Sequence, residues 1–171
     1  MSDKLANEAG PVSFGERLAS SQAFASLFRD GMSLVEETAA YLDGPGRKES
    51  KILERAAALA YATESMRLTT RLMQLASWLL LHRAVNEGEM SLDQASRERT
   101  KVKLAAGSGG DPDVLALLPD GLRTLIERSI RLEVRVRRLD ATIHSRTDEA
   151  PANPVERQIG LLKRAFESET P

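Results

Sequence analysis

The side chains that most often perform chemistry in proteins are sparse in this sequence of 171 residues. It contains no cysteine and two histidines, His82 and His144, neither of which has the His-x-x-x-His or Glu-x-x-His spacing of a metal site. Glu36 and Glu37 are adjacent, so on a helix they face different directions and make a poor acid–base pair. We therefore expect no catalytic residue, no metal site and no cofactor, and we expect both histidines to be solvated near helix C-termini.

Two groups of polar side chains could instead bind another protein. The first, the polar strip, contains the only tryptophan and consists of Glu64, Arg67, Arg71, Gln74 and Trp78. The second, the arginine face, repeats at a 3-4-3 spacing and consists of Arg128, Arg131, Arg135 and Arg138. Tryptophan and arginine often anchor interfaces, and a row of cations favours an acidic partner. The simpler alternatives are that the strip pairs within the fold while Trp78 fills the edge of a core, and that the arginine face is solvated and balanced by glutamates.

A long helix must carry the polar strip. The stretch Arg47–Glu87 has no internal glycine or proline, so we expect one unbroken helix, entered through a reversing turn at residues 43–46 and ended by Gly88. Its first seam is Leu68, Leu72, Leu75 and Leu79, extended by Tyr61 and Ser65. Its second seam points nearly the opposite way and consists of Leu59, Met66, Met73 and Leu80. A helix that is apolar over so wide an arc should be covered from more than one direction.

Two further long helices are expected on either side of it. Ser20 or Ser21 is a plausible N-cap for a helix reaching about Leu42, and Gly31 within it suggests a close neighbour. Its expected apolar face is Phe24, Phe28, Val35, Ala39 and Leu42, with Leu27 and Met32 at the edges. The other helix, from residues 119–121 to about Ser145, has the seam Leu122, Leu125, Ser129, Leu132, Val136, Leu139 and Ile143. A capping box at Ser91 and Gln94 predicts a short helix over residues 92–104, and residues 114–118 predict a further helical turn.

These elements predict an all-α fold, an antiparallel three-helix bundle with short accessory helices and flexible termini. We expect a flexible arm at residues 1–12, a helical domain at residues 13–146 and a flexible tail at residues 147–171. Because two partners leave the second seam partly uncovered, we also expect a homodimer. The tail holds an amphipathic segment, the tail peptide, with apolar residues at i, i+4, i+7 and i+11: Val155, Ile159, Leu162 and Phe166.

The amino-acid composition argues against some classes of binding partner. The chain has 24 Lys and Arg against 25 Asp and Glu, a net charge of −1, which gives no general attraction to nucleic acid or anionic membranes. No apolar run is long enough to span a bilayer, and the N-terminus lacks the pattern of a secretory signal, so we expect a cytoplasmic protein without a membrane or nucleic-acid partner. The alternative is a small DNA-associated helical regulator that uses the arginine face from Arg128 to Arg138.

Two stretches resemble a known family. Residues 58–81, ALAYATESMRLTTRLMQLASWLLL, continuing to Met90, resemble the RcdA family of alphaproteobacteria, regulators of degradation of the cell-cycle regulator CtrA. Residues 28–46, with Glu36, Glu37 and the sequence YLDGPG at residues 41–46, are similar to the same family. The resemblance implies a dimerising three-helix bundle that acts as a non-enzymatic adaptor of the ClpXP protease.

The resemblance also implies partners. Such an adaptor works with CpdR, a response-regulator-like protein that primes the protease, and delivers cell-cycle substrates directly or through a second adaptor. A location at the cell pole would then follow from the partners. On this basis we expect the polar strip and the arginine face to contact partners or cargo, and the tail peptide to engage the primed protease.

Overall fold

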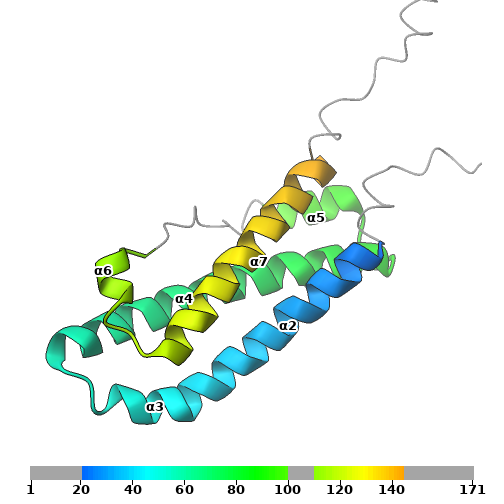
Figure 1. Ribbon diagram of the computed structural model, residues 1–171. Coiled ribbons are helices and arrows are strands. Elements are labelled where there is room, and N and C mark those ends of the chain that lie inside the picture. The colour runs from blue at the N-terminus through cyan, green and yellow to red at the C-terminus, as the bar shows by residue number, and fades with distance from the viewer. Residues whose placement is uncertain (1–20, 100–109, 145–171) are drawn as a thin grey trace, which may run out of the picture.

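Three long helices dominate the structure, a computed structural model that describes residues 21–99 and 110–144. The helices are α2 (Gln22–Asp43), α3 (Pro45–Ser50), α4 (Arg55–Asn86), α5 (Leu92–Arg99), α6 (Pro112–Leu115) and α7 (Asp120–His144). Helices α2, α4 and α7 pack against one another in all three pairings, with α5 and α6 against α4 (Figure 1). The prediction of an all-α fold is confirmed. The arm, the tail and the tail peptide lie outside the described residues.

Helix α2 begins where the sequence predicts, but its buried face is different. The Ser21 side chain caps the helix by accepting a hydrogen bond from the Phe24 amide at 3.4 Å. The buried residues are Phe24, Leu27, Gly31, Leu34 and Thr38, whereas Val35 is half-buried and Ala39 is exposed. The predicted face was therefore rotated. Because α2 packs against both α4 and α7, the line between these two helices is buried most deeply.

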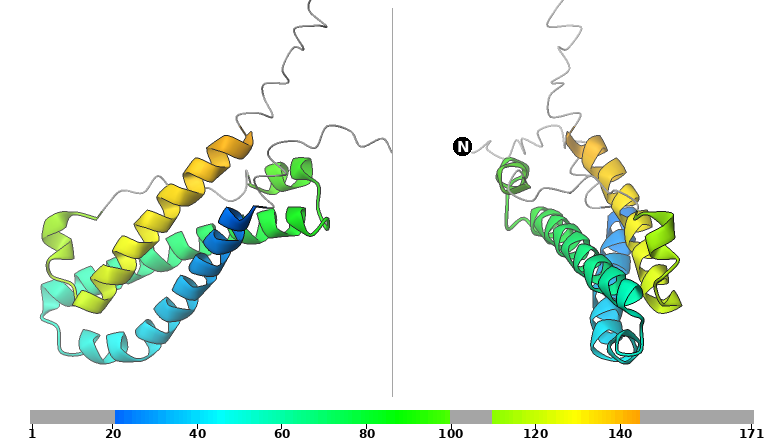
Figure 2. Two further views of the ribbon diagram at one scale, coloured as in Figure 1. Left: turned by 45° about the vertical axis from the view of Figure 1, so that its right-hand side comes forward. Right: turned by 90° about the vertical axis from the view of Figure 1, so that its left-hand side faces the viewer.

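The predicted single helix over Arg47–Glu87 is wrong, since the chain breaks at residues 51–54. Residues 43–46 do not reverse the chain. Pro45 occupies the first turn of α3, where a missing amide costs nothing, and α3 follows α2 with a bend (Figures 1 and 2). The reversal comes after α3, so α4 starts at Arg55 rather than Arg47.

Tyr41 fixes the bend between α2 and α3. Its hydroxyl donates a hydrogen bond to Glu49 at 2.5 Å, and burial together with this bond raises the pKa of the Tyr41 phenol. A Cβ atom on Gly46 would lie 2.6 Å from the tyrosine ring, and one on Gly121 would lie 2.5 Å from it. The ring is thus enclosed between α3 and the start of α7, and this packing outweighs local helix propensity.

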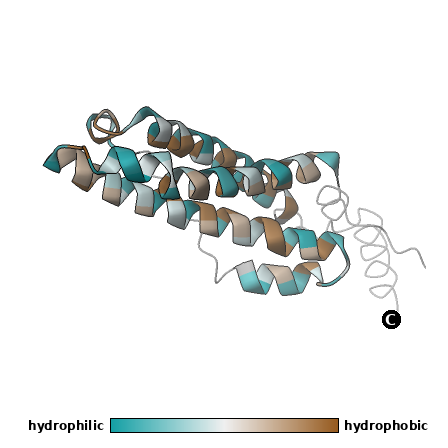
Figure 3. Cartoon of the chain, turned by 90° about the horizontal axis from the view of Figure 1, so that it is seen from below, coloured by the Kyte–Doolittle hydropathy of each residue, from teal (hydrophilic) through white to brown (hydrophobic). Residues whose placement is uncertain are grey.

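The core follows the seams predicted for α4 and α7. The first seam is buried, with Leu68 and Leu79 at 0% exposure. On α7 the buried seam residues are Leu122, Leu125, Ser129, Leu132, Val136 and Ile143, while Leu139 is half-buried. A Cβ atom on Gly31 would lie 2.5 Å from Leu79 Cδ1, which confirms the expected close neighbour. Figure 3 shows that each long helix carries both hydrophobic and hydrophilic segments along its length.

The short helices begin at side-chain caps. The Ser91 amide donates to Gln94 Oε1 at 3.0 Å and the Gln94 amide donates to Ser91 Oγ at 3.2 Å, so the predicted capping box is confirmed. The predicted extension of α5 to residue 104 lies outside the described residues. Helix α6 begins two residues earlier than expected, because Asp111 accepts a hydrogen bond from the Asp113 amide at 3.0 Å and Pro112 starts the turn. Among the helices described, none is long and apolar enough to cross a membrane.

Candidate functional site

Trp78 lies in the core between α4 and α7. Its side chain has 0% exposure, and its indole Nε1 donates a hydrogen bond to Asp140 Oδ1 at 2.8 Å. The ring also packs against Phe24, with ring centroids 6.3 Å apart. Trp78 therefore presents no surface to a partner. The expectation that it anchors a binding partner is wrong, and the alternative that it packs in the core is correct.

Arg71, in the middle of the polar strip, also packs against α7. Arg71 donates to Ser129 Oγ at 3.0 Å and pairs with Glu133 at 3.1 Å, and Arg137 pairs with the same carboxylate at 2.7 Å. The Glu133 side chain is 6% exposed, so its charge is buried and neutralised by two guanidinium groups. Arg71 and Trp78 thus form an internal contact between α4 and α7, because α7 packs on this side of α4.

The edge of the strip reaches the surface at Arg67. Glu64 is buried at 4% exposure and accepts a hydrogen bond from Arg67 at 2.6 Å. The Arg67 side chain is 58% exposed, and Gln74 is half-buried. Of the five predicted residues, Arg67 is therefore the one whose charge is most accessible to another molecule.

His82 is buried, which corrects the expectation of a solvated histidine. It has 2% exposure and its ring centroid lies 4.1 Å from that of Trp78, one turn earlier on α4. Helix α5 packs against α4, so the C-terminal part of α4 is not open to solvent on every side, as had been expected. The spacing of Trp78 and His82 by four residues was the signal that both share one side of the helix. The side chain of His144 lies outside the described residues.

The arginine face is partly neutralised by α2. Arg128 pairs with Glu37, and Arg135 pairs with Asp30 at 2.8 Å. Hydrogen bonds from Arg128 and Ser33 lower the pKa of the Glu37 carboxyl below its ordinary value of 4.5. These pairs leave a face of mixed charge, which weakens the alternative of DNA binding, since DNA requires a net positive surface.

The arginines line a cleft between α2 and α7. Its volume is about 470 Å³ and its walls are Asp30, Ser33, Leu34, Arg128, Arg131, Leu132 and Arg135. Arg131 and Arg138 are exposed, and within the described part of the chain neither forms a salt bridge. The cleft therefore combines an apolar floor with an available cation at Arg131.

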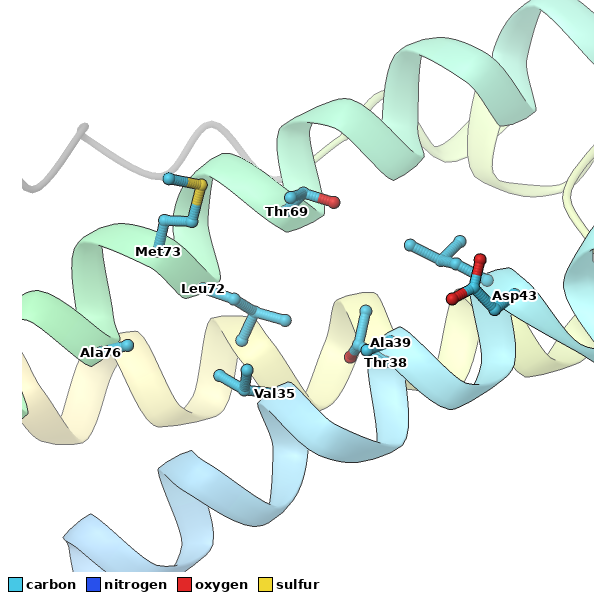
Figure 4. A pocket seen from close by; sticks show the side chains of 9 residues that line it. Val35, Thr38, Ala39, Asp43, Thr69, Leu72, Met73 and Ala76 are labelled. Carbon is cyan, nitrogen blue, oxygen red and sulfur yellow. The ribbon is translucent and has the colours of Figure 1, made fainter.

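The second seam of α4 is exposed along its whole length. Leu59, Met66, Met73 and Leu80 are 70%, 72%, 66% and 52% exposed. Beside it, an apolar groove of about 340 Å³ runs between α2 and α4 (Figure 4). The groove is lined by Val35, Thr38, Ala39, Leu42, Asp43, Thr69, Leu72, Met73 and Ala76. Within the described residues, the buried Thr38 hydroxyl has no hydrogen-bond partner.

Comparison with known proteins identifies the family. A family model described as "Protein of unknown function (DUF1465)" matches residues 15–166. The crystal structure of RcdA from Caulobacter crescentus CB15 is similar, with 53% sequence identity and a TM-score of 0.63, over 76% of this chain and 98% of that chain. This chain belongs to the RcdA family. No curated protein matches it.

RcdA-family membership confirms the resemblance read from residues 28–46 and 58–90. The family model extends to residue 166 and so includes the tail peptide. Sequence reasoning missed two side chains that hold α7 to α4, namely Glu133 and Asp140. A signal was present for Glu133, because it lies one turn after Ser129 and next to Leu132 in the α7 seam, where a carboxylate must be paired.

Proposed function

We propose that this RcdA-family protein is a non-enzymatic adaptor in regulated proteolysis. It binds a cell-cycle substrate or a second adaptor and brings it to a ClpXP protease primed by a CpdR-like response regulator. The observation that carries this proposal is the 53% identity with RcdA over 98% of that chain. An adaptor adds no chemistry, because it works by raising the effective concentration of the substrate at the protease. We further propose that it acts in the cytoplasm and reaches the cell pole through its partners.

Two surfaces are assigned to partners in this proposal. Arg131 and Arg138 contact an acidic region of the cargo or of the second adaptor, with Arg67 as a further exposed cation. Arg128 and Arg135 contribute less, since each would have to leave a carboxylate of α2 before binding another. The tail peptide engages the primed protease. A homodimer completes the proposal, supported by the exposed second seam, because large exposed apolar surfaces commonly mark interaction sites.

A reconstituted degradation assay tests the proposal. It contains ClpXP, a CpdR-like response regulator and a candidate substrate, with and without this protein. We expect faster substrate loss with the protein present, and a return to the basal rate for Arg131→Glu with Arg138→Glu. The matched control is Lys48→Glu with Lys51→Glu, which makes the same change in net charge at exposed positions near the opposite end of the bundle. If the unaltered protein does not accelerate degradation with all partners present, the adaptor proposal fails.

A further inference from the structure

The groove between α2 and α4 has the properties of a helix-binding site. Along α4 it continues into the second seam, so apolar side chains extend from Leu59 to Leu80, about 32 Å at 1.5 Å per residue. On the α2 side the exposed residues next to the groove include the carboxylates of Glu36 and Asp43. Figure 4 shows the two helices diverging on either side of the labelled side chains. An amphipathic helix would cover the seam and the groove together.

The tail peptide matches this groove in length and pattern. Its four apolar residues recur at 155, 159, 162 and 166, the spacing of one face of a helix. Twelve helical residues span about 18 Å, which is shorter than the exposed seam. Lys163 lies beside the apolar face of such a helix, where it would meet the acidic edge formed by Glu36 and Asp43. The apolar face and the flanking charge are therefore both complementary to the groove.

The tail can reach the groove from the end of α7. The pairs Arg128–Glu37 and Arg135–Asp30 show that α7 runs antiparallel to α2, so α7 ends near the start of α2. The middle of the groove, at Thr38, lies about 16 residues along α2, or about 24 Å. Residues 145–154 provide ten residues of linker, which can span about 33 Å when extended. The linker is long enough for docking within one chain while α7 stays intact.

We propose that residues 155–166 dock as an amphipathic helix in the α2–α4 groove of the same chain. A short tether within one chain gives the peptide an effective concentration on the order of millimolar, so even weak docking is populated. The docked tail covers the part of the second seam that borders the groove, and it withholds the tail peptide from other proteins. Release of the tail exposes the peptide and the groove at the same time, so a second copy and the docked tail exclude each other. The docking itself is independent of the proposed adaptor function.

Methionine methyl groups report on this docking in the full chain. Met66 and Met73 lie on the second seam, whereas Met90 lies beyond the C-terminus of α4 and serves as an internal control. We expect Ile159→Ser with Leu162→Ser to shift the ¹³C-methyl resonances of Met66 and Met73 but not that of Met90, because loss of two aliphatic side chains lowers the docked population about tenfold or more. The matched control, Arg157→Ser with Arg164→Ser, changes the opposite side of the peptide helix and should leave all three resonances in place.

Three results of the methyl measurement would overturn the docking proposal. Absence of a shift at Met66 and Met73, or equal shifts in both variants, overturns the proposal. A shift that disappears on dilution of the protein shows that a second copy occupies the groove, which also overturns it.

Disulfide trapping gives an independent measurement, since the chain contains no cysteine. The variant Met73→Cys with Leu162→Cys is expected to form an intramolecular disulfide about tenfold or more faster than Arg138→Cys with Leu162→Cys, when docking is favoured over random encounter by this factor. Arg138 is exposed on α7, outside the groove, and lies close to the end of that helix. The pairs Arg71–Glu133 and Trp78–Asp140 place Met73 farther from this end, so random tail motion alone would favour the control. Mixing isotope-labelled and unlabelled chains separates bonds within one chain from bonds between two. Equal rates, or mainly intermolecular bonds, contradict docking within the chain.

Discussion

Two sides of α4 differ in a way that residue type alone does not predict. The side that carries Arg71 and Trp78 is largely covered by α7, while the second seam leaves Met66 and Met73 largely exposed. On the α7 side, Arg71 and Trp78 each meet a partner on the neighbouring helix. On the other side, no described element covers the apolar seam. Burial in this protein is thus decided by which helix packs where, and polar groups enter the interior when a matching group meets them.

The buried polar contacts also define how α4 and α7 align. Trp78 and Asp140 are 62 residues apart in sequence, as are Arg71 and Glu133. One alignment of the two helices therefore satisfies both pairs, and a shift by one turn would leave buried charges unpaired. The exposed seam imposes no such alignment, because apolar contacts are not directional. The polar side thus specifies one structure, whereas the apolar side can accept more than one occupant.

The largest effect is expected for Trp78→Ala. Removing this side chain leaves a cavity and removes the hydrogen bond from the indole to Asp140, and should lower the free energy of unfolding by about 3–5 kcal/mol. Met66→Ala on the opposite side should cost less than about 0.5 kcal/mol, as is usual for exposed positions. Urea denaturation followed by circular dichroism measures both. Similar losses of stability for the two variants would mean that the two sides of α4 contribute equally to the folded core.

Glu133→Ala is expected to have the next largest effect, about 3 kcal/mol, because it leaves the guanidinium of Arg71 without its buried carboxylate. The control is Glu87→Ala, which removes a carboxylate paired at 2.7 Å with Arg83 while both side chains are about half exposed. That pair should contribute no more than about 1 kcal/mol. The same denaturation experiment distinguishes the two, and equal losses would count against a buried charge cluster.

Glu37→Gln tests the exposed contact between α2 and α7. Because pairing with Arg128 lowers the Glu37 pKa in the folded state, the unfolded state binds the proton more tightly. The stability from this pair is therefore present above pH 4.5 and is lost as the pH falls through the lower folded-state pKa. We expect a loss of up to about 1 kcal/mol at pH 7, reduced by added salt and absent in strong acid. A loss that is independent of pH would assign the effect to packing.

The smallest effect on folding is expected for Leu59→Ser combined with Met66→Ser. Both side chains are at least 70% exposed, so the free energy of unfolding at low protein concentration should change by less than about 1 kcal/mol. If the second seam also joins two copies, as the homodimer proposal has it, sedimentation should show a higher proportion of monomer. A large loss of stability at low concentration would mean that these two side chains belong to the folded core, contrary to their exposure.

Local signals predicted much of this fold. The Ser21 cap, the Ser91–Gln94 capping box and the heptad-like seam of α7 are set by neighbours within one or two turns, and all three are found in the structure. The break at residues 51–54 was missed because the sequence there contains neither glycine nor proline. Tyr41 links the preceding helix α3 to α7, because its hydroxyl bonds to Glu49 and its ring lies against Gly121, which is distant in sequence.

The polar strip was harder to predict for the same physical reason. The spacing of Arg71 and Trp78 correctly places them along one side of a helix, but their burial depends on Glu133 and Asp140, more than 60 residues later. A tryptophan with nearby arginines is equally compatible with an interface and with a core. The positions of neighbouring helices decide between them, and this information is not contained in the spacing along one helix.

The single buried tryptophan gives the protein an optical property of its own. Trp78 is the only indole in the chain, and its ring lies between α4 and α7 beside His82. Its emission therefore reports separation of these two helices without interference from another fluorophore of the same kind. The α2–α4 groove lies on a different side of α4. Occupancy of the groove can therefore be followed by the methionine methyl resonances, and separation of the helices by tryptophan fluorescence.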